Sequence, residues 1–429
     1  MNSKIIELAE YQTKTSCLED HFSNDETEYE EDNILKELKL ENKDRQLVYD
    51  LKKKNILIIK ELKNGLEISS KSHIGVVQFA NFTVKILPKF ALKPTSLPKI
   101  IAYSYDLDDV TLPSSEINFE SDENYLIDIL IFFFIRKCQN LLRSGLLKSY
   151  ILYENDSKFL RGKLLIQKQI IHNIQHRPLF ACEFDELEYN NIENQILLYT
   201  LKQSYRLTQS DSLRKDIRIL IRQFSDRVDE KIISSNDFNS VTYNRLNKHY
   251  ESIHDLCKII ISKTGISNFY ESKKHVGTSF FVDMNLIFEK FVTRLFKDFY
   301  NSEYFVEDQK NKKAWITDEG AYTNIRTDIL LSSPMEKKIV IDTKYKRKIS
   351  HTDSFQIFFY VHEYNEKKGY ALLPLYLDSK KSENMTAVVS GLDIDIRRID
   401  LEKTLDWIYS EPRNKSQLNK MLLELIPAN

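Results

Sequence analysis

Short apolar runs separated by polar turns follow one another from Gln46 onward. Their β-branched and aromatic residues, and turns such as Lys63-Asn64-Gly65, are typical of β-strands joined by tight connections. The expected strands are residues 56–60, 65–69, 74–79 and 82–87. The pattern therefore predicts a small β-rich N-terminal domain over residues 44–118, in which a short helical piece precedes the strands.

A helical spacing of apolar positions replaces this pattern over residues 119–275. Residues 125–142 are apolar on all sides, as expected of a helix buried inside the fold. Further helices are expected at 194–205, 212–224 and 243–262, with non-helical interruptions at 159–163 and 182–187. A segment with two glycines, residues 265–278, is expected to end this mainly helical region.

Helical and strand-like patterns are mixed in the last third of the chain. An amphipathic helix is expected at 285–299 and a second at about 353–364. Two apolar runs that end near Asp328 and Asp342 lie between these helices, and strand-like runs follow at 370–376 and 392–399. We predict a multidomain α+β or α/β protein whose C-terminal α/β core covers residues 276–400, with a helical tail over residues 401–429.

Composition narrows the class of protein. A chain of 429 residues with 42% hydrophobic and 29% charged residues has room for two or three globular domains. Its net charge of -1 gives no overall basic signal, so a nucleic-acid surface must be local. The four cysteines form no CxxC pair, which favours a reducing compartment without structural zinc. With no apolar run of signal-peptide or membrane-spanning type, we expect a cytoplasmic protein that does not enter a membrane.

Residues 1–43 carry a dense acidic cluster between Asp25 and Asp32. Such a composition is typical of a solvated, flexible arm, and it also suits an acidic segment that docks on a basic partner. Both interpretations stay open at this point.

Candidate chemistry lies in the two runs around Asp328 and Asp342. Side chains alternate along a strand, so Asp342 and Lys344 share a face at about 7 Å. The intervening loop, residues 332–337 with Pro334 inside it, predicts a hairpin that brings Asp328 opposite Asp342 to within one residue. Two carboxylates and an ammonium group then meet at one end of the ribbon, which is the donor set of a hard-metal site.

This order of elements, with D-x(13)-D-x-K on two strands, resembles the PD-(D/E)xK nuclease core. The resemblance implies that Asp328, Asp342 and the carbonyl of Thr343 bind Mg²⁺, as one ion or two, and that Lys344 orients water or stabilises the transition state. It also implies a metal contact for Glu289 on the first helix and an auxiliary role for Gln356 on the second.

Each of these assignments has an ordinary structural alternative. D-x-K is also a common solvated charge pair at a strand end, and Glu289 is also an exposed residue of an amphipathic helix. Gln356 and Tyr360 share a helix face that has to supply core residues. Six basic residues near the hairpin either bind a DNA backbone or only keep a surface soluble: Lys310, Lys312, Lys313, Lys346, Arg347 and Lys348.

A closer resemblance is to the McrC family, the nuclease subunit of McrBC restriction systems. The segment 341–364, IDTKYKRKISHTDSFQIFFYVHEY, is similar to its catalytic end. The same family is resembled, in the same order, by residues 75–89, 160–162 with 184–187, and 285–292. Thr327 stands where many members have proline, and the acidic segment has no family counterpart.

The McrC resemblance implies a Mg²⁺-dependent DNA endonuclease in antiviral defence, whose N-terminal half stimulates a hexameric AAA+ GTPase, McrB. Two alternatives stay open, a GTPase-activating adaptor with little cleavage and a stand-alone sequence-specific nuclease. The chain has no GxxxxGK[ST] loop, so we expect it to bind no nucleotide by that route. Arg161 is either part of the motor contact or a structural arginine beside Gly162.

Overall fold

Two compact units make up the chain in the computed structural model. One comprises Met1–Tyr125 and Ile266–Asn429, and the other comprises Leu126–Gly265. The structure describes residues 4–16, 28–88, 96–107, 125–267, 280–300, 304–316, 322–334, 337–376, 382–387 and 391–427. Within these ranges, no helix has the length and apolar character needed to cross a lipid bilayer.

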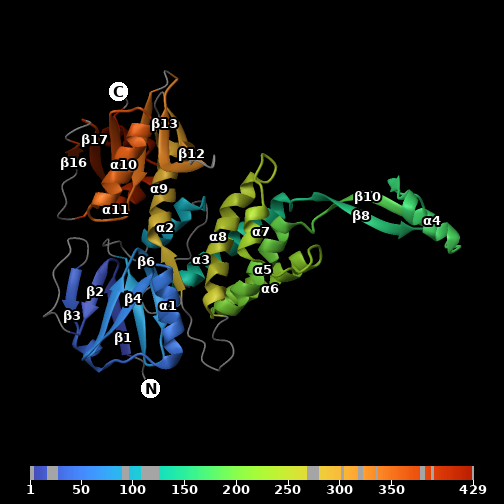
Figure 1. The fold of residues 1–429 in the computed structure, drawn as a ribbon, viewed down its shortest axis with the longest axis horizontal. Helices are drawn as coiled ribbons and strands as arrows, with labels where there is room; N and C mark the ends of the chain where they lie inside the picture. Colours follow the sequence, from blue (N-terminus) through green and yellow to red (C-terminus); the bar gives the residue numbers. More distant parts are fainter. Residues whose placement is uncertain are drawn as a thin grey trace. The chain divides into compact units, whose positions relative to one another are not determined.

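Two four-stranded sheets form the N-terminal part of the first unit (Figure 1). One has the order β1 (Lys4–Ala9), β7 (Phe82–Leu87), β6 (His73–Gln78), β11 (Phe280–Asp283). The other has the order β3 (Glu28–Glu31), β2 (Gln12–Thr15), β5 (Gly65–Ser70), β4 (Leu57–Leu62). Their apolar sides form one core with Leu47 and Leu51 of α1 (Arg45–Lys53).

The N-terminal segment differs from the predicted arm over residues 1–43. Residues 4–9 pair in parallel with β7, and residues 12–15 and 28–31 extend the second sheet. Ile6 and Leu8 are buried in the common core, as is Leu35 of the 3₁₀ turn Asn33–Glu37. The composition of residues 1–43 did not indicate strands β1 and β2, whose partners β7 and β5 lie far along the chain. Residues 17–27, with much of the acidic cluster, lie outside the described ranges.

A six-stranded mixed sheet forms the C-terminal part of the same unit. Its order is β12 (Phe305–Ile316), β13 (Tyr322–Ser332), β14 (Lys338–Thr343), β15 (Lys368–Pro374), β17 (Asp393–Ile399), β16 (Ser382–Thr386). The strands β14, β15 and β17 are parallel, and the others are antiparallel to their neighbours.

Helices position this sheet. α10 (His351–Glu363) buries Ile357 and Val361 against Val340, Ala371 and Ile394 of the parallel strands. α9 (Met284–Phe299) contacts β12, β13 and β14, and it follows β11 directly along the chain. α9 also packs against α2 (Ser96–Ser104) and α12 (Lys415–Leu425), and α12 packs against α11 (Leu401–Ile408). The predicted tail is therefore part of the packed unit.

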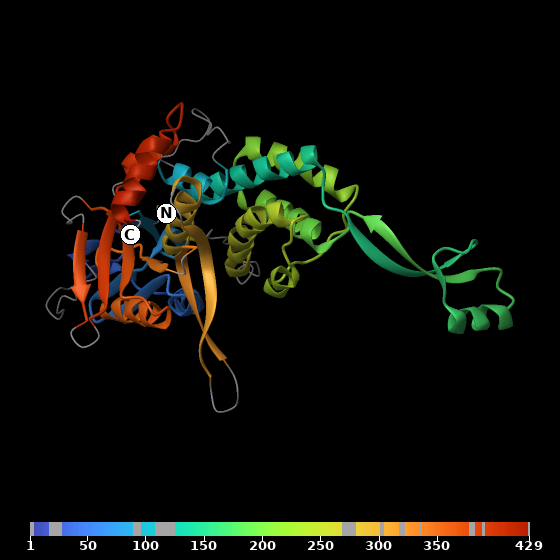
Figure 2. The ribbon, with the colours of Figure 1, turned by 90° about the horizontal axis from the view of Figure 1, so that it is seen from above.

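The second unit combines a helical bundle with a projecting ribbon. The helices are α3 (Tyr125–Ser144), α5 (Ile192–Leu207), α6 (Asp211–Ser225), α7 (Ser235–Ser240) and α8 (Glu251–Ser267). β8 (Ser149–Ser157) pairs antiparallel with β10 (Phe180–Glu188), which also pairs with β9 (Lys163–Leu164). Figure 2 shows this ribbon running out from the helices to α4 (Ile166–Ile174) at its far end.

Candidate active site

The β13–β14 hairpin brings the two predicted aspartates to one end of the mixed sheet. Ile329 pairs with Ile341 in the antiparallel register, so the next positions beyond this pair are Asp328 and Asp342. Thr343 ties the two strands together at this point, because its backbone N and its Oγ1 each donate to Asp328 Oδ2 at 2.8 Å. The expected register is confirmed.

Asp342 is the most deeply buried ionisable group of the cluster, with 1% of its surface exposed. It follows Val340 on one face of β14, and Val340 lies in the core under α10. Its Oδ1 accepts no hydrogen bond from any described residue. Burial and the nearby Asp328 carboxylate raise the pKa of Asp342 to about 7.

Lys344 partly compensates this buried charge. Its Nζ lies 2.8 Å from Asp342 Oδ2 and donates to Gln356 Oε1 at 3.3 Å. Burial lowers the pKa of Lys344, but the Asp342 carboxylate more than offsets that effect, so the net pKa is raised and the side chain stays an ammonium. Gln356 Nε2 donates in turn to Tyr360 Oη at 2.7 Å, which orients the amide oxygen toward Lys344.

Glu289 approaches the same cluster from α9. It is half-buried, and its Oε1 accepts a hydrogen bond of 3.0 Å from Gln309 Nε2. Burial and the charge of Asp328 raise the pKa of the Glu289 carboxyl group. The negative charge of Asp328 thus affects the pKa of Glu289. Solvent would screen this charge from an exposed residue on an amphipathic helix.

The start of α10 fixes the second helix against this end of the sheet. Ser350 and Asp353 form a capping box: Asp353 Oδ2 accepts from Ser350 N at 2.9 Å, and Asp353 N donates to Ser350 Oγ at 3.2 Å. The cap is therefore Ser350, not Thr352 or Asp353 as a start near residue 353 would require. Lys346 Nζ also lies 2.8 Å from Asp353 Oδ2, which links the strand exit to the helix.

Several of the six basic residues near the hairpin have partners within the chain. Lys346 pairs with Asp353, and Lys310 Nζ lies 2.5 Å from Glu307 Oε1. Lys312 donates to the Glu363 carbonyl, and Arg347 lies over the ring of Tyr376. These contacts favour a structural role for those four side chains, although exposed faces of the same cations can still meet a phosphate.

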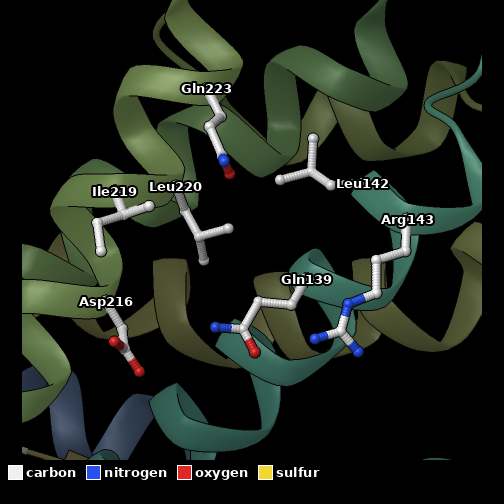
Figure 3. Close-up of a pocket in the computed structure, with 7 residues that line it drawn as sticks. All are labelled: Gln139, Leu142, Arg143, Asp216, Ile219, Leu220 and Gln223. Carbon is white, nitrogen blue, oxygen red and sulfur yellow. The ribbon is translucent and has the colours of Figure 1, made fainter.

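A cavity of about 370 Å³ in the helical unit has a different character (Figure 3). Its lining comes from α3 and α6, and it mixes apolar, amide and charged side chains. Arg143 and Asp216 are its charged residues. None of the predicted site residues lines it, so the candidate active site is the open cluster at the end of β13 and β14.

A family match covers part of the N-terminal sheets, the helical unit and this cluster. Residues 68–376 match the family described as McrBC 5-methylcytosine restriction system component. The chain belongs to this family. No curated protein matches the sequence significantly.

The chain is similar to solved structures of McrBC assemblies. One is a refined half-complex from the tetradecameric assembly of Thermococcus gammatolerans McrB AAA+ hexamers with bound McrC. The match has a TM-score of 0.53 and 19% identity, and it covers 99% of this chain and 100% of that chain. The cryo-EM structure of the T. gammatolerans McrBC complex matches with a TM-score of 0.41 and 21% identity, over 68% of this chain and 87% of that chain.

The predicted site residues of this McrBC component come together in the structure. Asp328, Asp342, Thr343, Lys344 and Gln356 are linked by hydrogen bonds or ion pairs, and Glu289 interacts with Asp328 electrostatically. Gln309 and Ser350, which hold Glu289 and α10, were not predicted. Gln309 lies in a charged run without a distinctive pattern, whereas Ser350 followed by Asp353 is a capping-box signal that was available in the sequence.

Arg161 has a structural environment. Its guanidinium lies 2.7 Å from Glu186 Oε1 and stacks over the ring of Phe184 at 4.2 Å. Gly162 has φ of +61°, and a Cβ there would lie 2.3 Å from the Glu183 carbonyl oxygen. Two motif pieces that are distant in sequence thus meet across β9 and β10, which favours the structural interpretation of Arg161.

Proposed function

We propose that this McrBC component is the Mg²⁺-dependent DNA endonuclease subunit of its restriction system, with a PD-(D/E)xK core. The observation that carries the proposal is the convergence of Asp328, Asp342 and Lys344 around a buried carboxylate oxygen that accepts no hydrogen bond from a described residue. A buried carboxylate without sufficient partners costs stability, so its retention favours a ligand that completes it.

The donor chemistry fits a hard divalent cation. Asp328, Asp342 and the Thr343 carbonyl supply oxygen atoms at one strand end, with Glu289 at its edge. Within the described ranges no three His, Cys, Asp or Glu side chains come together to form a metal site, so water would fill the remaining positions, as Mg²⁺ prefers. When bound, Mg²⁺ would lower the pKa of a coordinated water and stabilise charge on the phosphate.

The chain's own residues would orient the attacking water and stabilise the developing charge. The Lys344 ammonium, held between Asp342 and Gln356, is placed to orient the attacking water and to stabilise negative charge on the phosphate oxygens. Asp342 must be ionised to bind the metal. Its raised pKa disfavours the ionised form in the folded chain, and a bound cation would favour it. Gln356 keeps Lys344 directed at the cluster.

The test is cleavage by Asp342→Ala and Lys344→Ala variants of the full chain in complex with its GTPase partner. Both should lose cleavage by at least about 10³-fold while circular dichroism and partner binding are unchanged. A matched control is Lys368→Ala, which breaks a second ion pair of the same sheet, with Asp395 at 2.8 Å. Wild-type cleavage rates in both site variants would refute the assignment.

We further propose that an AAA+ GTPase hexamer of McrB type is the partner, and that the β8–β10 ribbon with α4 contacts it. This ribbon carries apolar side chains that are largely exposed, such as Phe159 (78%), Ile166 (68%) and Ile174 (73%). Several more lie along it: Tyr150, Leu152, Leu160, Ile170, Ile171, Phe180 and Leu187. Many exposed apolar side chains on one projecting element favour a protein interface there.

Charge substitutions test this contact and separate the nuclease from an adaptor. Ile170→Lys and Ile174→Lys should abolish partner binding and GTPase stimulation, whereas Ile232→Lys, at another exposed isoleucine of the same unit, should not. The adaptor alternative predicts full stimulation without any cleavage by the wild-type complex. Site-specific cleavage by the chain alone with Mg²⁺ would instead favour the stand-alone nuclease.

A further inference from the structure

A two-stranded arm extends the mixed sheet beyond the candidate active site. β13 pairs with β14 only from Ile329 to Ser332, whereas its pairing with β12 continues to Tyr322 and Ile316. Figure 2 shows these two strands running on past the rest of the sheet. We call residues 310–314 and 324–328 the β12–β13 arm, and Asp328 lies at its base.

One face of the β12–β13 arm packs against α10 and the residue that follows it. Ile325 is buried in the core that α10 forms with the parallel strands, and Ala314 packs against this core. Lys312 donates to the Glu363 carbonyl, and its Nζ lies 4.8 Å from the centre of the Tyr364 ring. These contacts fix the orientation of the arm, so the alternate side chains are directed away from α10.

The other face of the arm is open to solvent. The side chains that alternate with the packed ones are exposed: Asn311, Lys313, Asn324 and Arg326. The register places Arg326 opposite Asn311 and Asn324 opposite Lys313, so the four residues form two cross-strand pairs. Two cations and two amides, with no carboxylate among the four, make this face positive and rich in hydrogen-bond donors.

The open face leads directly to the candidate active site. Along β13 the exposed Arg326 is followed by Thr327, which is 0% exposed, and then by the half-buried Asp328. Arg326 and Asp328 therefore share a face at about 7 Å, the spacing of alternate residues on a strand. That spacing corresponds to about two nucleotide steps of about 3.4 Å along a DNA axis. A polymer with one phosphate in the centre would lie across this face.

Arg326 differs from other cations near the hairpin. Lys310 and Lys346 are paired with Glu307 and Asp353. Within the ranges that the structure describes, the Arg326 guanidinium has no ion-pair partner. Its planar fork of N–H donors matches the oxygens of a phosphate. Arg326 is therefore the side chain of this face that is best suited to a DNA backbone.

We propose that the open face of the β12–β13 arm binds DNA beside the scissile phosphate, with Arg326 and Lys313 on backbone phosphates and the two asparagines donating to phosphate or sugar oxygens. The inference rests on the proposed nuclease function and names the surface that holds its substrate. Cations and side-chain amides are the groups that contact DNA backbones in proteins. An acidic protein segment would also match the charge, but docked here it would cover the approach to Asp328, so the position favours DNA.

The first experiment measures binding of a fluorescein-labelled DNA duplex to the full chain in EDTA, which prevents Mg²⁺-dependent cleavage. Arg326→Ala should weaken binding by about 10-fold and reduce the slope of log Kd against log salt concentration by about 1, because one phosphate contact is lost. Arg326→Lys should keep the slope, and Arg326→Glu should weaken binding further than Arg326→Ala. Asn311→Ala should weaken binding by about threefold without changing the slope, since an amide carries no charge.

The second experiment measures plasmid cleavage by the complex with the GTPase partner and Mg²⁺. Arg326→Ala should raise KM for DNA by about 10-fold and change kcat by less than about threefold, because it removes binding that is equal in the ground state and the transition state. GTPase stimulation should not change. The matched control is Arg45→Ala, at an exposed arginine of α1 that pairs with Glu61 at 3.3 Å. This control should alter neither DNA affinity nor its salt dependence.

The outcomes are distinct. A wild-type chain that binds no duplex, or an Arg326→Glu variant with unchanged Kd and salt slope, would overturn the DNA surface and leave the nuclease proposal intact. Loss of GTPase binding in Arg326→Glu with unchanged DNA affinity would also overturn it, and would identify an acidic protein segment as the occupant. If Asp342→Ala cleaves normally while the Arg326 variants lose DNA affinity, the nuclease assignment fails and the DNA surface stands.

Discussion

Replacing Asp342 by asparagine is expected to stabilise the metal-free protein at pH 8, although the same change should abolish cleavage. Asparagine keeps the shape of the side chain but cannot ionise. In the folded chain the pKa of Asp342 is about 7, against an ordinary value of 3.8, because the carboxyl group is buried beside Asp328. The folded state therefore binds this proton more tightly than the unfolded state between about pH 4 and pH 7.

The size of the effect follows from this difference. Each unit of pKa corresponds to about 1.4 kcal/mol, so the ionised Asp342 lowers the free energy of unfolding by about 4 kcal/mol once the pH is above 7. This contribution is absent only below about pH 3, where both states hold the proton. The stability of wild type relative to Asp342→Asn should therefore fall by about 4 kcal/mol as the pH is raised through this window.

The assay is urea unfolding in EDTA at pH 5 and pH 8, with hydrogen exchange at the β14 amides as the local reporter. A local reporter is needed because a chain of two compact units need not unfold in one step. Excess Mg²⁺ should then stabilise wild type selectively, by about 2.7 kcal/mol at 100 times its Kd, and reduce the difference.

The Asp395→Asn variant is the matched control with the opposite sign. Asp395 is also buried in this sheet, but bonds from Lys368 and Arg397 outweigh burial and lower its pKa. Its ionised form stabilises the fold above its ordinary pKa, so Asp395→Asn should destabilise the protein at pH 8. If Asp342→Asn is no more stable than wild type at pH 8 in EDTA, or the difference does not depend on pH, the electrostatic reasoning fails.

Three further predictions concern the helical unit. Burial lowers the pKa of His254 to about 4, so the folded state favours its neutral form. Thermal unfolding should therefore show that the free energy of unfolding falls by about 2 kcal/mol between pH 7 and pH 5. His254→Gln should flatten this pH profile. Gly162→Ala should speed hydrogen exchange in β10, whereas Gly145→Ala, where a Cβ would meet nothing within 4 Å, should have a smaller effect. Asn194→Ala should lower the urea midpoint by an amount equivalent to about 1–3 kcal/mol, because it removes the bonds of 2.9 and 2.8 Å that the buried Asn194 amide donates to the Leu147 and Tyr189 carbonyls.

Elements with a strong local pattern were predicted well from the sequence. The four strands expected between residues 56 and 87 correspond to β4, β5, β6 and β7, with bounds that differ by at most two residues. α9 begins at Met284, one residue before its predicted start, and the β13–β14 register is as expected. In these segments the apolar period, the turn residues and the packing all favour the same structure.

The strands that were not predicted from the sequence have a common physical cause. β8 has the sequence SYILYENDS, half polar and largely exposed, so it lacks the apolar alternation of a strand in a core. β1 lies parallel to β7, and no local pattern specifies a partner more than 70 residues away.

Two features of the first unit carry a local cost in stability. Asp342 is buried beside a second carboxylate, and Tyr11 is held in a left-handed conformation next to the buried Glu10. A sequence selected only for stability would replace Asp342 by a neutral residue and Tyr11 by glycine, since both changes remove a local cost. The surrounding structure instead holds the Asp342 carboxylate 2.8 Å from the Lys344 ammonium, and Ser70 holds the turn that carries Tyr11 by donating to the Ala9 carbonyl. Local costs of this kind are expected of a functional centre, because there geometry is maintained at the expense of stability.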